Sequence, residues 1–159
     1  MPRACEVRHI FVAEPWDTKR QVKAQGVGEV SVLKLNQILS IPTGTYTYQQ
    51  MHSSFVRRRD GQTLKFSMGS QEACGITYKA GFFHADSLRV ELRSYFDGEG
   101  DSALSLPLPA GPSLSYDEIP LRLRLIAGRV LARPQPLRSA AFRDQSPQRP
   151  VGLEPGGVA

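Results

Sequence analysis

The sequence predicts a single, mainly antiparallel β-domain, either a sandwich or a partly open barrel, with at most one or two short helices. Three observations support this fold class. Segments rich in β-branched and aromatic residues, which fit a pleated surface, recur between residues 6 and 132. Apolar and polar residues alternate within several of these segments, as in a strand with one buried and one wet face. Fourteen glycines and twelve prolines favour turns between the segments over long helices.

The first predicted strands lie in the N-terminal third of the chain. Residues 6–13 (EVRHIFVA) are rich in valine, isoleucine and phenylalanine. Residues 28–39 (GEVSVLKLNQIL) are ambiguous, because Val30 and Val32 alternate as in a strand, whereas the later leucines would also fit one face of a helix. The β-branched content favours a strand. Residues 43–50 (TGTYTYQQ) predict another, with its tyrosines on one face and its threonines on the other.

Residues 53–66 (SSFVRRRDGQTLKF) predict a hairpin. Asp60 and Gly61 suit a two-residue turn, because glycine accepts a positive φ and aspartate does so better than most residues. Counting outward from this turn pairs Phe55 with Phe66 at the base and gathers the arginines towards the tip. We therefore expect a hairpin with an aromatic root and a cationic end.

Further elements are predicted after this hairpin. Residues 74–83 (CGITYKAGFF) and 87–96 (SLRVELRSYF) predict strands, the second with strict alternation of apolar and charged side chains. Residues 97–115 contain three prolines and predict a long, turn-rich connector.

The C-terminal part of the chain is expected to join it to other subunits. Residues 118–131 (EIPLRLRLIAGRVL) alternate leucine with Arg122 and Arg124 and predict a last strand, whose edge another chain could complete. Residues 133–159 are rich in proline and predict a tail that is disordered unless a partner holds it. The chain is thus expected to comprise a β-rich domain, residues 1–132, and this tail. A core strand followed by a tail without a role is the alternative. The leucines of the predicted buried face are Leu121, Leu123 and Leu125.

Charge and cysteine content limit the classes of function. Twenty basic and fifteen acidic residues give a formal net charge of +5, which permits an anionic partner without requiring one. The N-terminus lacks the apolar segment of an export signal, and no apolar run approaches the roughly 20 residues that cross a bilayer. Cys5 and Cys74 fit no metal-type spacing and are expected to be free thiols. A cytoplasmic location without a membrane partner is expected.

A nucleic-acid contact is predicted within residues 43–66. Three consecutive arginines near the hairpin tip, with a lysine on the second arm, can contact phosphates. Two tyrosines on one strand face just upstream can stack on bases. The alternatives are arginines that are simply solvated and protect a sheet edge, and tyrosines that pack in the core or at its rim. The candidate binding residues are Arg57, Arg58, Arg59, Lys65, Tyr46 and Tyr48.

Signs of catalysis are weaker. His84 and Asp86 would lie on the same side of a strand, as in a metal pair or a histidine–carboxylate dyad. Cys74 would need a histidine near it in space to act as a nucleophile, and a buried structural thiol is the alternative. The acidic residues of 97–101 resemble the start of a calcium loop, but Leu108 stands where a carboxylate is needed. No catalytic residue, metal ligand or cofactor is therefore predicted.

Three functions of different classes are compatible with these features. The leading prediction is a non-catalytic binding module, an accessory subunit of a nucleoprotein assembly that contacts nucleic acid through the basic hairpin. The alternative is a structural protein of a multi-subunit assembly, such as a viral particle, joined to other protein subunits through its C-terminal strand and tail. The second alternative is a small enzyme that uses His84 with Asp86, or Cys74.

Overall fold

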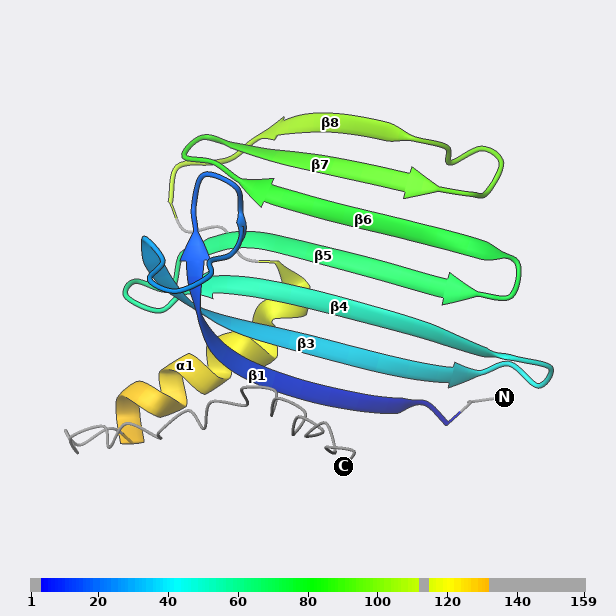
Figure 1. The fold of residues 1–159 in the computed structure, drawn as a ribbon, viewed down its shortest axis with the longest axis horizontal. Coiled ribbons are helices and arrows are strands. Elements are labelled where there is room, and N and C mark those ends of the chain that lie inside the picture. The colour runs from blue at the N-terminus through cyan, green and yellow to red at the C-terminus, as the bar shows by residue number, and fades with distance from the viewer. Residues whose placement is uncertain (1–3, 112–114, 132–159) are drawn as a thin grey trace, which may run out of the picture.

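One curled sheet makes up most of the structure. The computed structural model describes residues 4–111 and 115–131, so the predicted tail of residues 133–159 lies outside the described part. Eight antiparallel strands follow the order β2-β1-β3-β4-β5-β6-β7-β8 and curl into a half-barrel (Figure 1). The elements are β1 (Glu6–Asp17), β2 (Val22–Lys23), β3 (Val30–Pro42), β4 (Thr47–Arg57), β5 (Thr63–Glu72), β6 (Gly75–Phe83), β7 (Ser87–Ser94), β8 (Ser102–Pro107), a 3-10 turn η1 (Tyr116–Glu118) and α1 (Ile119–Leu131).

The predicted fold class is confirmed in its partly open barrel form. Each strand from β3 to β7 pairs with the next along the chain, as expected when strongly alternating segments are separated by short turns. The ambiguous segment 28–39 forms β3 and not a helix. The predicted connector 97–115 was wrong in part, because β8 lies within it. Its alternation of Leu104 and Leu106 with serine and alanine fits an edge strand paired with β7.

The predicted C-terminal strand was wrong, because residues 119–131 form the helix α1. Leu121 is completely buried whereas Leu123 is 62% exposed, a difference that an alternating strand would not produce. The side chains that face the sheet follow helical spacing, from Glu118 through Leu121 to Leu125. Pro120 is tolerated because the first helical turn needs no backbone donor there.

Among the described residues, no helix is long and apolar enough to cross a membrane.

Each face of the sheet carries a core of its own, because successive strand residues point to opposite sides. On the helix face, which α1 covers, Leu35 and Val56 pack against Leu121. On the opposite face, here called the loop face, Trp16 and Val32 pack with Leu64. The connection between β1 and β2 reaches this second face, where the Gln21 carbonyl accepts a hydrogen bond from the Lys65 ammonium. The partly buried side chains around the two cores are Phe11, Leu33 and Leu125 on the helix face, and Val30 and Phe55 on the loop face.

Candidate nucleic-acid interface

The loop between β4 and β5 carries the consecutive arginines and differs from the predicted turn. The Arg57 N–H donates to the Gln62 carbonyl, and the Gly61 N–H donates to the Arg57 carbonyl, so residues 58–61 form a four-residue loop. Gly61 has φ +77°, which explains why glycine stands there. The Asp60 carboxylate accepts from the Gln62 N–H, and this bond, aided by the nearby arginines, lowers the pKa of Asp60.

The predicted pairing of Phe55 with Phe66 was wrong. Phe55 pairs with Lys65, and Val56 pairs with Thr63, which leaves Leu64 as the extra residue of a β-bulge. Phe55 therefore packs on Trp16 on the loop face, with ring centroids 4.7 Å apart. The Phe66 ring instead lies edge-on to Phe83, at 6.2 Å. The hairpin is rooted in two cores, through Phe55 on the loop face and Val56 on the helix face, and not in one aromatic pair.

Two of the four predicted basic residues are turned inward. The Arg57 side chain is 22% exposed, lies 3.3 Å from the Asp60 carboxylate and donates to the Gln62 side chain. The Lys65 ammonium sits 5.1 Å from the centroid of the Phe82 ring, and burial lowers the pKa of this lysine. Arg58 and Arg59 are exposed at the loop, and the Arg59 guanidinium lies 3.4 Å from the Asp60 carboxylate. The solvent-facing charge of the hairpin is therefore concentrated in Arg58 and Arg59.

The predicted tyrosines lie at the other end of β4, beside the turn that joins β3 to β4 (Figure 1). Tyr48 and Arg57 are nine positions apart in the sequence, which corresponds to about 30 Å along a strand. The two tyrosine rings lean on each other with centroids 5.2 Å apart. Their hydroxyl oxygens are 3.2 Å apart, and this hydrogen bond raises the pKa of Tyr48. The structure therefore does not bring the tyrosines and the arginines together.

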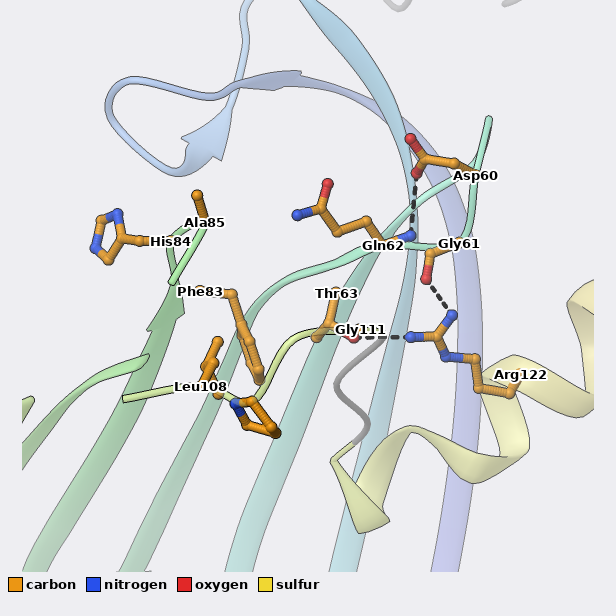
Figure 2. A pocket seen from close by; sticks show the side chains of 11 residues that line it. Asp60, Gly61, Gln62, Thr63, Phe83, His84, Ala85, Leu108, Gly111 and Arg122 are labelled. Atoms are coloured by element: carbon orange, nitrogen blue, oxygen red, sulfur yellow. Dashed lines mark hydrogen bonds between the residues drawn. The ribbon is translucent and has the colours of Figure 1, made fainter. Parts of the chain in front are cut away.

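A buried polar junction joins the arginine loop to α1 (Figure 2). The Glu118 carboxylate is fully buried and accepts hydrogen bonds from the Thr63 hydroxyl and from the Arg122 guanidinium, each at 2.8 Å. Arg122 also donates to the Gly61 carbonyl at the end of the loop. The sequence interpretation missed this junction, because it placed Arg122 on the wet face of a strand. The (i, i+4) spacing of Glu118 and Arg122 was the signal that could have revealed it.

A surface groove lies between α1 and the sheet, next to the arginine loop. Its volume is about 560 Å³, and Arg58 and Arg124 line it. Among the described residues, no carboxylate lies within ion-pair distance of either arginine. The rest of the lining is small or apolar: Ala13, Leu33, Leu125, Ala127 and Gly128. We call Arg58, Arg59 and Arg124 the arginine surface.

No protein-family model, curated protein or solved structure matches the chain. The candidate interface therefore rests on its own geometry. Arg124, which the sequence interpretation had assigned to a strand, joins Arg58 only because α1 is a helix that packs on β3. Two segments far apart in the sequence thus bring positive charge to one groove.

The residues of the enzyme alternative do not converge. His84 and Asp86 are exposed in the turn between β6 and β7, and Cys74 lies beyond the other end of β6. The nine residues of β6 therefore place Cys74 about 30 Å from His84 and Asp86. Cys5 and Cys74 are exposed free thiols, as predicted, so the buried-thiol alternative for Cys74 was wrong. Within residues 4–111 and 115–131, no three histidine, cysteine, aspartate or glutamate side chains are grouped to hold a metal.

A cavity of about 270 Å³ lies beside the buried junction (Figure 2). His84 lies on one side of this cavity and Arg122 on the other. The Arg122 guanidinium already forms an ion pair with the Glu118 carboxylate, at 2.8 Å. Arg122 is thus engaged in holding the loop to the helix, and we place no catalytic role in this cavity.

Proposed function

We propose that the protein is a non-catalytic binding module that contacts nucleic acid through the arginine surface, as an accessory subunit of a nucleoprotein assembly. The observation that carries the proposal is the convergence of Arg58 and Arg124 on one groove whose lining contains no acidic residue. Arginine suits this role, because its guanidinium stays charged and presents several donors to phosphate oxygens. The arginine surface replaces the wider set of candidates predicted from the hairpin alone.

The junction between Glu118 and Arg122 supports the proposal by fixing the arginine loop in place. Arg122 holds the Gly61 carbonyl, and Arg124 lies two residues further along the same helix. The arginines on the loop and on α1 therefore keep a defined spacing before any partner arrives. A preorganised charged surface loses less conformational entropy on binding than a flexible one.

We also propose a cellular location for the protein. Both exposed cysteines are free thiols, which is typical of proteins in a reducing environment. We propose a cytoplasmic location on this ground.

Binding can be tested by fluorescence polarisation with single- and double-stranded DNA and RNA at two salt concentrations. We expect affinity to fall steeply with salt, because arginine–phosphate contacts release counterions. The variant Arg58→Ala/Arg59→Ala should bind more weakly and lower the slope of log affinity against log salt by about 2.

The matched control is Arg8→Ala/Arg93→Ala, which removes the same charge near the opposite end of the sheet. This control should leave the slope unchanged. The proposal is contradicted if the protein does not bind at low salt, or if the two double variants change binding equally.

A second candidate function is assembly through the sheet edge. The predicted route through a C-terminal strand is lost, because that segment is α1. The edge strand β8 offers another route, since Leu104 and Leu106 are 48% and 47% exposed on it. An open edge of this kind can pair with a strand of another chain.

A further inference from the structure

The Arg124 guanidinium lies over an aromatic ring. The guanidinium carbon lies 4.6 Å from the centroid of the Phe11 ring, as in a cation–π stack. Phe11 itself packs on the buried cluster of Leu35, Val56 and Leu121. The ring is thus supported by the core from below, and Arg124 above it is an exposed residue.

The groove combines a flat charged plane with an apolar floor. Arg124 and Arg58 both line the groove and supply its positive charge. Leu33 and Leu125 supply apolar surface between the helix and the sheet. A nucleotide has the complementary composition, because a flat base carries little charge and its phosphate is anionic. Bases stack well on arginine guanidinium planes and on aromatic rings.

We propose that this groove binds an unpaired nucleobase, stacked on the outer face of the Arg124 guanidinium, while Arg58 contacts a neighbouring phosphate. The inference rests on the proposed function and adds a preference for single-stranded nucleic acid. In a duplex each base is covered by its neighbours, so only an unpaired strand can insert a base into a groove of this kind. The Phe11–Arg124 stack takes the role that the sequence had suggested for Tyr46 and Tyr48.

The test compares three labelled ligands of equal length: oligothymidylate, an abasic strand with the same phosphates, and a duplex. We expect the affinity of the full-length protein for oligothymidylate to be about five-fold higher than its affinity for the abasic strand, or higher still, because stacking adds to the phosphate contacts. Arg124→Lys keeps the charge but removes the flat plane. This variant should bind the abasic strand as the parent does and lose most of the preference for the strand with bases.

Phe11→Leu provides a second variant, because it retains apolar volume in the core and removes the supporting ring. Arg8→Lys, a conservative change on the same strand as Phe11 and away from the groove, is the matched control and should change neither affinity. If the parent binds both strands equally, or if Arg124→Lys retains the full preference, the inference is overturned and the proposed function still stands. If the parent binds neither strand at low salt, the proposed function fails as well.

Discussion

Glu118 is the residue on which the position of the arginine loop depends. Its carboxylate is fully buried and accepts from the Thr63 hydroxyl and the Arg122 guanidinium. A buried ion pair of this kind contributes little net stability compared with apolar residues of similar volume. Removal of one partner, however, leaves the other charge without compensation in the interior.

We expect Glu118→Gln to lower the free energy of unfolding by about 3 kcal/mol, because Arg122 would lose its counter-charge while remaining three-quarters buried. Urea denaturation followed by circular dichroism measures this change. The double variant Glu118→Gln/Arg122→Met should recover part of the loss, since no unpaired charge is left. Losses that simply add in the double variant would show that the two side chains do not interact.

At the scale of elements, α1 decides which leucines belong to the core. Leu121 is fully buried between Leu35 and Val56, whereas Leu123 is 62% exposed. We expect Leu121→Ala to lower the free energy of unfolding by about 3 kcal/mol through the cavity that it leaves. Leu123→Ala, the matched control in the same helix, should change stability by less than about 0.5 kcal/mol. Equal losses at both positions in urea denaturation would contradict the helical packing.

The sequence allowed the strands to be predicted but not the register of the hairpin. Alternation marked β7 and the start of β3, and β-branched and aromatic residues marked β1 and β6, because such side chains fit a pleated surface. Asp60 and Gly61 correctly indicated a reversal of the chain, but the loop has four residues, and the bulge at Leu64 shifts the pairing. Which residue enters a bulge depends on packing on both faces, and this information is not local to the segment.

The alternation of leucine and arginine in residues 118–131 was misleading for a similar reason. The pattern fits a strand over a few residues, and it also contains the (i, i+4) pairs of a helix. The helix forms because Leu121 and Leu125 then reach one face together with Glu118 and Arg122. The candidate site depended on this choice, since Arg124 meets Phe11 only from a helix.

At the scale of the whole molecule, the two ends of the sheet differ in charge. The connections 18–21 and 58–61 carry four basic residues, Lys19, Arg20, Arg58 and Arg59, against one acidic residue, Asp60, and they share one end because the strands alternate in direction. The turn 95–101, at the other end, carries Asp97, Glu99 and Asp101 and no lysine or arginine. This asymmetry would steer an anionic partner towards the arginine surface and away from the acidic turn.

The open sheet also predicts a test of the second candidate function. If copies of the chain pair through β8, we expect the apparent mass in light scattering to rise with protein concentration. Leu104→Lys/Leu106→Lys should then restore a monomer, because charged side chains on an edge strand disfavour strand addition. Lysines at Leu123 and Ile126, two exposed positions of α1, form the matched control and should leave the association unchanged. A monomer at every concentration would rule out self-assembly through this edge.

The buried junction also bears on the order in which the chain folds. Strands β4 to β8 pair only with their neighbours along the chain, so each hairpin from β3–β4 to β7–β8 can form as soon as its second strand is available. The Arg122–Gly61 and Glu118–Thr63 contacts instead close segments of 61 and 55 residues, whose closure entropy is larger than that of any hairpin turn. Docking of α1 is therefore expected to be a late step. Until it occurs, a chain still emerging from the ribosome has its sheet but lacks the groove that Arg58 and Arg124 form together.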